Sequence, residues 1–146
     1  MSVEYGNSIF GISRIGGILV AIATGLCVDR LSLKKMLFFF AFGTGLVTML
    51  LAVRSIPVIK VLLFVQAAIA TGLFPVALVS ISRLFDREAR GQATGFVVML
   101  GMAGSGIFPW LLGLSGDLVS FRLGIFLLGL SNTFAAGLLF FLKGLR

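Results

Sequence analysis

The chain has 146 residues, of which 59% are hydrophobic and only 12% charged, and 15 are phenylalanine. This composition excludes a soluble domain, which could not bury so much apolar surface. The net charge of +7 comes from bases in short clusters between apolar runs, so we interpret them as membrane topology signals and expect no nucleic-acid partner.

Five apolar segments are long enough to cross about 30 Å of hydrocarbon, which takes roughly 20 helical residues. The N-terminus lacks the basic start of a cleaved signal peptide, so we count the first segment as a retained span. The segments are too long and too uniformly apolar for barrel strands, so we predict an all-α bundle in a single membrane domain, residues 1–146. The expected spans are 8–28, 36–53, 58–82, 93–115 and 123–142.

The distribution of bases predicts the orientation of these spans. If the spans alternate in direction, eight bases fall on one side of the membrane and three on the other. The side with eight is expected to be cytoplasmic, which places the N-terminus outside and the C-terminus inside. We therefore expect an integral membrane protein, in the cell (inner) membrane. The eight bases are Arg30, Lys34, Lys35, Arg83, Arg87, Arg90, Lys143 and Arg146; the three are Arg54, Lys60 and Arg122.

Small residues recur at every fourth position in the first and fourth spans. Such stripes allow another helix to approach closely. Each ends at an acid, Asp29 or Asp117, and these acids fall at opposite membrane faces. The pattern favours an inverted three-helix repeat of the kind found in secondary transporters. The first stripe is Ser13, Gly17, Ala21 and Gly25; the second is Gly101, Ser105, Pro109 and Gly113.

The stretch "GLCVDRLSLKK", residues 25–35, resembles the cytoplasmic signature of the major facilitator superfamily, Gly-x-x-x-Asp-Arg-x-Gly followed by two bases. Gly25, Asp29 and Arg30 match it. Ser32 stands where the second glycine belongs and the lysines come one position late, which favours the degenerate copy after the family's eighth helix. "SRLFDREARGQATG" and "GIFPWLLGLSGD" resemble the loop before the eleventh helix and that helix itself.

The resemblance implies a twelve-helix transporter that works by alternating access, with its substrate held at the midplane. The five spans would then be the eighth to twelfth helices of a solute permease, and the chain a C-terminal fragment that does not transport alone. Its expected partners are a small-molecule solute, with or without a coupling ion, membrane lipid, and the missing N-terminal helices or another membrane chain. In the family, the signature acid locks one conformation, so we predict that Asp29 pairs with Arg83 or, as second choice, Arg87.

Three polar residues within spans are weak candidates for substrate binding: Arg14, Gln66 and Asn132. Each has a structural alternative. The Arg14 head could reach the outer interface while its stem lies along the helix, and the two amides could form interhelical hydrogen bonds, an interpretation favoured for Asn132. Pro75 should kink the third span. Together with Gly72, it could take part in the rocking motion of a transporter. The phenylalanine run at 38–40 and the pair at 140–141 are expected to face lipid.

The chain lacks the residues or motifs that several catalytic functions require. An intramembrane serine protease needs a histidine, which the chain lacks, and an aspartyl protease needs two acids close together. "GMAGSG", residues 101–106, lies inside a span without the strand that precedes a phosphate-binding loop. With one cysteine, Cys27, and no histidine, we expect no enzyme, cofactor or metal site. The alternative that stays open is a structural or accessory subunit packing against a larger membrane protein.

Overall fold

The computed structural model describes residues 3–28, 30–53 and 55–141. Within these residues it is built from α-helices and one short 3-10 turn, and it contains no strand. This confirms the predicted all-α fold. The elements are α1 (Val3–Cys27), α2 (Leu33–Leu50), α3 (Ile56–Leu84), α4 (Arg87–Leu118), α5 (Phe121–Leu138) and the 3-10 turn η1 (Leu139–Phe141).

Each helix coincides with one predicted span, although α1, α3 and α4 extend several residues beyond theirs. In the described part of the chain, α2, α3, α4 and α5 are long and apolar enough to cross a membrane. The apolar part of α1, Gly11–Cys27, is shorter than the roughly 20 residues that a span needs. Four of the five predicted spans thus have the length and composition to cross a membrane, and a fifth span through α1 remains a prediction.

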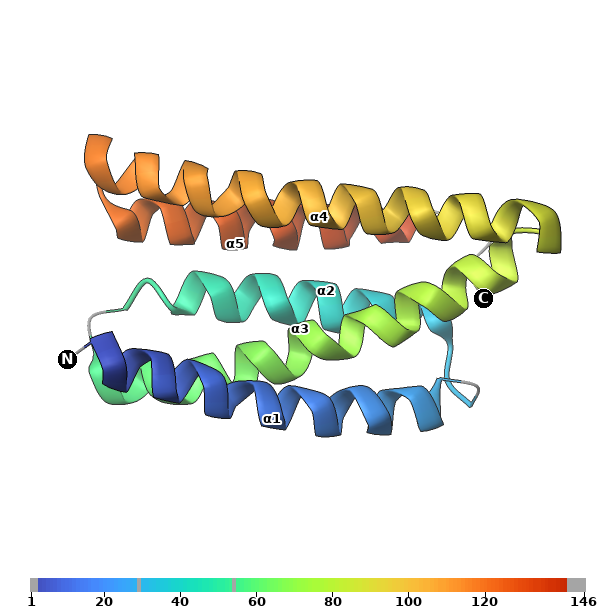
Figure 1. Ribbon diagram of the computed structural model, residues 1–146, viewed down its shortest axis with the longest axis horizontal. Coiled ribbons are helices and arrows are strands. Elements are labelled where there is room, and N and C mark those ends of the chain that lie inside the picture. The colour runs from blue at the N-terminus through green and yellow to red at the C-terminus, as the bar shows by residue number, and fades with distance from the viewer. Residues whose placement is uncertain (1–2, 29, 54, 142–146) are drawn as a thin grey trace.

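The helices alternate in direction, and Figure 1 shows α1, α3 and α5 running one way and α2 and α4 the other. The connections are short, with two residues between α3 and α4 and two between α4 and α5. The α1–α2 and α3–α4 connections consequently lie at the same end of the bundle (Figure 1). This end carries Arg30, Lys34, Lys35, Arg83, Arg87 and Arg90, the basic clusters that the sequence grouped together.

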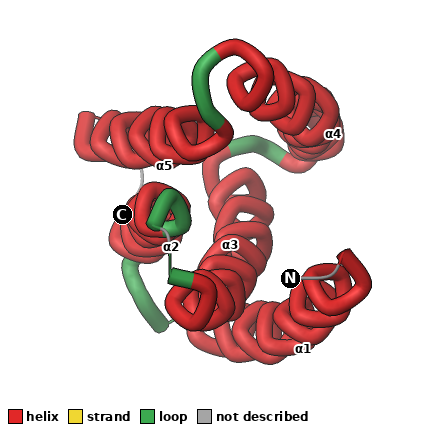
Figure 2. The backbone as a smooth tube through the Cα atoms, turned by 90° about the vertical axis from the view of Figure 1, so that its left-hand side faces the viewer, coloured by secondary structure: helices red, strands yellow, loops and turns green. Residues whose placement is uncertain are grey.

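Helix α3 is the centre of the packing. It contacts α1, α2 and α4, while α5 contacts α2 and α4, and α1 packs on no described helix except α3. Figure 2 shows this arrangement end-on, with α1 and α4 on either side of α3 and apart from one another. A buried cluster forms near the basic end, where α2 and α3 meet the residues after α1; its members are Val28, Leu33, Met36, Phe40 and Val76.

The α2–α5 crossing depends on two glycines that the sequence analysis did not single out. At the α2–α5 crossing, a Cβ on Gly129 would lie 2.5 Å from the backbone nitrogen of Met49 and 2.7 Å from the carbonyl oxygen of Gly45. A Cβ on Gly45 would in turn lie 2.9 Å from the carbonyl oxygen of Gly129. The two backbones approach so closely that no other residue fits at either position without moving a helix.

The prediction that the phenylalanine run 38–40 faces lipid is wrong for Phe40. This residue is only 8% exposed, because the absence of a side chain at Gly72 leaves room for its ring between α2 and α3. Phe39, on the other side of the helix, is 64% exposed as expected. Phe38 stacks on Phe42 one turn later, with ring centroids 5.2 Å apart. Three consecutive helical residues point in three directions, so one of them reached the core.

The turn between α3 and α4 is held by a side chain. The Arg90 guanidinium donates a hydrogen bond of 2.7 Å to the carbonyl oxygen of Ser82. This carbonyl belongs to the last turn of α3, where backbone acceptors lack partners within the helix. A positive charge is also favourable at the C-terminal end of a helix dipole. Arg90 on α4 thus caps α3.

Candidate functional site

The small-residue stripe of α1 faces α3 over its first half. Ser13 and Gly17 are buried, and a Cβ on Gly17 would lie 2.5 Å from Thr71 Oγ1 and 3.1 Å from the carbonyl oxygen of Ala67. Gly17 therefore lies at a close approach of α1 to α3. Gly25, at the other end of the stripe, is exposed and has open space where its Cβ would be. The stripe is covered at one end and open at the other.

The stripe of α4 is not covered by any described helix. Helix α4 has no buried residue along its 32 residues, and added Cβ atoms on Gly101 and Gly113 would meet nothing within 4 Å. Ser105 and Pro109 are exposed. The prediction that these four residues pack helices together is therefore not realised within the described chain. The physical reason is that α4 packs mainly on α5 and only slightly on α3, and the Gly101 and Ser105 part of the stripe borders an open cavity between α3 and α4.

The three candidate substrate residues are not gathered into one site. Arg14 is exposed on α1, and Gln66 is partly buried on α3. Asn132 lies on α5, which does not contact α1 or α3, and its amide donates a 3.3 Å hydrogen bond to the carbonyl oxygen of Ala41 on α2. The interhelical alternative for Asn132 thus has a geometric basis. Asn132 also lines a cavity of about 510 Å³, together with Thr48, Phe108, Leu128, Ser131 and Ala135.

The residues of the resembling signature lie at the basic end of the bundle. Arg30 is exposed after α1, Arg83 is exposed in the last turn of α3, and Arg87 begins α4. Asp29 is outside the described residues, so its pairing with Arg83 or Arg87 stays a prediction. Helices α1 and α3 run in the same direction and contact one another, which brings their basic ends to the same end of the molecule (Figure 1).

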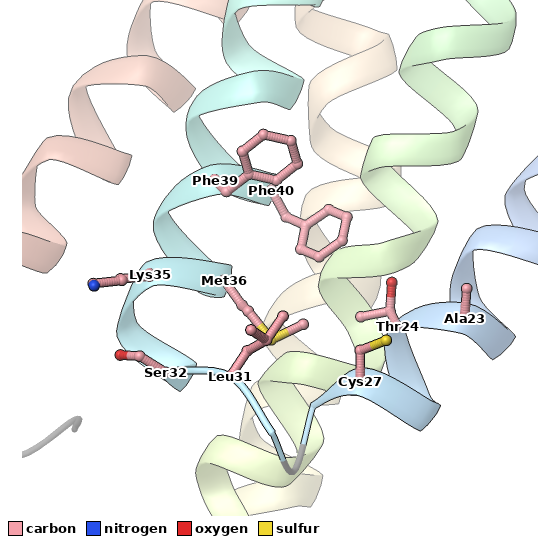
Figure 3. Close-up of a pocket in the computed structure, with 9 residues that line it drawn as sticks. All are labelled: Ala23, Thr24, Cys27, Leu31, Ser32, Lys35, Met36, Phe39 and Phe40. Carbon is pink, nitrogen blue, oxygen red and sulfur yellow. The ribbon is translucent and has the colours of Figure 1, made fainter.

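Two further cavities border the signature and the second stripe. One, of about 420 Å³, lies between α1 and α2 beside their connection, and Figure 3 shows its lining. The other, of about 390 Å³, lies between α3 and α4 and is bordered by Gly101 and Ser105 of the α4 stripe and by Phe74 and Ile81 of α3. The second is an opening between two helices that barely touch.

The sequence analysis did not predict the first cavity, because it interpreted residues 25–35 as a topology signal and as a family signature. The available signal was the combination of Ser32 and Lys35 at the start of an apolar helix, next to an apolar helix end at Cys27. The described residues contain no group of three or more histidines, cysteines or acids that could hold a metal ion.

Comparison with known proteins gives one result for the chain as a whole. A family model described as Major Facilitator Superfamily matches residues 1–145. No individual curated protein and no solved structure matches. The match covers almost the full length, and it agrees with the apolar antiparallel helices and with the signature at residues 25–30. The chain is an integral membrane protein that belongs to the major facilitator superfamily, a family of membrane transporters.

Proposed function

We propose that the chain provides the eighth to twelfth helices of a solute transporter and that transport requires further helices, on the same polypeptide or another. The observation that carries this proposal is the uncovered face of α4. Alternating access places the substrate between two helical halves, and the described helices amount to less than one half. The transported solute is a small molecule, with or without a coupling ion.

The uncovered face is physically informative because of its composition. Lipid tails are as apolar as leucine, so a stripe of small residues gains nothing by facing lipid. The same stripe allows another helix to approach closely enough for extensive van der Waals contact. Gly101 and Gly113 have open space at their Cβ positions, whereas Gly17 on α1 is tightly covered. We infer that a further helix covers the α4 stripe in the assembled transporter.

The space beside α3 supports the same inference. Helices α1 and α4 both pack on α3 but do not contact one another (Figure 2). Toward α4, the gap is lined by apolar side chains such as Phe74, 59% exposed, and Met102, 71% exposed. Both are large side chains for which a covering helix would be a natural partner. We infer that one additional helix of the same half lies beside α3. The facing half of the transporter would cover the remaining surface.

Transport measurements test the proposal. Expressed alone, the chain should insert into the membrane and move no solute above background, and co-expression with the complementary seven-helix part should restore uptake. Gly113→Leu should abolish the restored uptake without lowering the amount of inserted chain. Gly137→Leu is the matched control, because Gly137 on α5 also has open space at its Cβ. Robust uptake by the isolated monomeric chain would overturn the proposal.

An accessory role is the second candidate, since the uncovered α4 face would equally accept a larger, unrelated membrane protein. Purification in mild detergent separates the two. A stoichiometric unrelated partner that detaches on Gly113→Leu would favour the accessory role. Association with the complementary helices alone would favour the transporter.

The proposed orientation has the basic end in the cytoplasm and the N-terminus outside. In a Cys27→Ser background, single cysteines at positions 32 and 91 should resist a membrane-impermeant reagent in intact cells. Cysteines at positions 55 and 120 should react, because these residues belong to the connections at the other end. Permeabilised cells provide the control for accessibility. Reaction of position 32 from outside would reverse the topology.

A further inference from the structure

The cavity between α2, α4 and α5 combines an apolar wall with several polar side chains. Its volume of about 510 Å³ is in the range of small-molecule pockets, which often lie between the helices of a bundle. Among the described residues that line it, none is charged and three carry hydrogen-bonding side chains. These three are Thr48 of α2 and Ser131 and Asn132 of α5. A mostly apolar pocket with a few polar groups is typical of a ligand site.

The two hydroxyls that line the cavity already use their hydrogens within their own helices. The Thr48 hydroxyl donates a hydrogen bond of 2.7 Å to the carbonyl oxygen of Thr44. The Ser131 hydroxyl donates one of 2.9 Å to the carbonyl oxygen of Leu128. A hydroxyl has a single hydrogen but two lone pairs, so both oxygens can still accept a hydrogen bond from a further donor.

The carboxamide of Asn132 also has an acceptor to spare. Its nitrogen donates to the carbonyl oxygen of Ala41, while no described group donates to its oxygen. Every buried side-chain nitrogen or oxygen of the described residues has a partner, so this oxygen is accessible. Asn132 lies eleven residues into α5, or roughly 16 Å at 1.5 Å per residue, near the middle of the span. An acceptor without a donor at this depth costs free energy, which a bound donor would recover.

We propose that this cavity binds an uncharged molecule through a hydroxyl group. A hydroxyl can donate to one of the three oxygens and accept from the second amide hydrogen of Asn132. A cation is disfavoured, because no acid among the described residues lines the cavity and an isolated charge loses its hydration there. Two sources share the required chemistry: a free polyol and the glycerol headgroup of a neutral lipid.

The occupant is a small molecule and not a further helix. The four small residues of the α4 stripe do not line this cavity, and α4 contributes Phe108 to it instead. A helix that covers the stripe would therefore approach α4 through other residues. The three acceptors also belong to α2 and α5, which already pack closely on one another at Gly45 and Gly129.

Native mass spectrometry of the purified chain tests this site. The micelles are of lauryldimethylamine oxide, a detergent without hydroxyls, and the probes are monooleoylglycerol and its hydroxyl-free counterpart, methyl oleate. Monooleoylglycerol should be retained more strongly. Thr48→Val combined with Ser131→Ala removes two acceptors and should weaken its binding about tenfold, as expected for two neutral hydrogen bonds. Ser105→Ala is the matched control, because that hydroxyl also bonds to its own helix but does not line this cavity.

Two further variants locate the bound hydroxyl. Asn132→Leu should abolish the preference for monooleoylglycerol, and the double variant, which keeps the bond from Asn132 to Ala41, decides the matter if Asn132→Leu fails to fold. Ala135→Phe should fill the cavity and weaken binding. Ala135 is exposed, so this change leaves the α2–α5 crossing intact. Displacement of monooleoylglycerol by excess free glycerol would identify a polyol site, and retention would identify a lipid headgroup site.

Three outcomes would overturn the proposal. Equal retention of monooleoylglycerol and methyl oleate would leave only an apolar groove. Unchanged binding in the double variant or in Ala135→Phe would place the bound molecule elsewhere. Stronger retention of oleylamine than of monooleoylglycerol would show a cation site. Circular dichroism of each variant establishes that the helices are retained, so that weakened binding reports the loss of the acceptors.

Discussion

The small-residue stripes of α1 and α4 look alike in sequence and differ in their surroundings. On α1, Ser13 and Gly17 are buried against α3, and the side chain of Thr71 occupies the space that a larger residue at 17 would need. On α4, the corresponding glycines face open space, and no residue of the helix is buried. The two helices together indicate that a stripe of small residues marks a face that another helix can approach closely. It does not tell whether that helix belongs to the described chain.

The largest expected effect comes from placing the same side chain on both stripes. Gly17→Val should destabilise the purified chain by about 1–3 kcal/mol, because the added atoms collide with Thr71 and with the backbone of α3. Gly113→Val should change stability by less than about 0.5 kcal/mol, as expected for an exposed position. The measurement is the free energy of unfolding in mixed micelles. Equal losses would show that the α4 stripe is covered after all.

A double-mutant cycle sharpens the α1 half of the comparison. If Thr71 is the obstacle, Gly17→Ala should be destabilising, and combining it with Thr71→Ala should recover about 1 kcal/mol relative to the sum of the single changes. Recovery should be partial, because the carbonyl oxygen of Ala67 still lies 3.1 Å from the new Cβ. Unfolding of the four variants under one condition gives the coupling. Strict additivity would place the collision elsewhere.

A smaller effect on stability is expected from removing a polar side chain. The comparison is between Asn132 on α5, which packs on α2, and Ser105 on the uncovered face of α4. Asn132→Leu should cost about 0.6–1.7 kcal/mol, the range for interhelical hydrogen bonds in membranes, because it removes the bond to Ala41. Ser105→Ala should be close to neutral in the isolated chain, since that hydroxyl bonds only to Met102 of its own helix at 2.7 Å. Unfolding midpoints compare the two. A neutral Asn132→Leu would return this residue to the substrate candidates.

The smallest expected effect concerns the signature acid at the end of the α1 stripe. An exposed ion pair stabilises by about 1 kcal/mol or less, so Asp29 paired with Arg83 would bias a conformational equilibrium more than it would hold the fold. Asp29→Arg and Arg83→Asp should each reduce uptake by the assembled transporter, and the double exchange should recover it. The same series with Arg87 serves as comparison. No recovery in either series would leave the role of this acid open.

The helices and their order could be predicted from the sequence because each apolar run is long and each connection short. The contacts between helices could not, because a helix that is apolar all round gives no face by which to choose its neighbour. Phe40 and the pair Gly45 and Gly129 are examples, and their roles depend on which helix crosses at that level. For the candidate site, the sequence suggested Gly17 as a packing residue because it lies in a stripe of small residues, and in the structure it lies against Thr71 and Ala67 of α3. The cavity between α1 and α2 could not be predicted, because two helices that are separate in the sequence form it.

The bond from Arg90 to the carbonyl oxygen of Ser82 has a mechanical consequence. Only two residues separate α3 from α4, and the Arg90 guanidinium links the two helices across this short connection. Bending at this corner requires the charge-assisted bond to break, which adds a cost of about 1.5–3 kcal/mol to a rotation of α4 away from α3. Helix α3 in turn touches α1 and α2. A substitution that removes the Arg90 guanidinium should therefore loosen the orientation of α4 relative to α3 without changing the packing of α3 on α1 and α2.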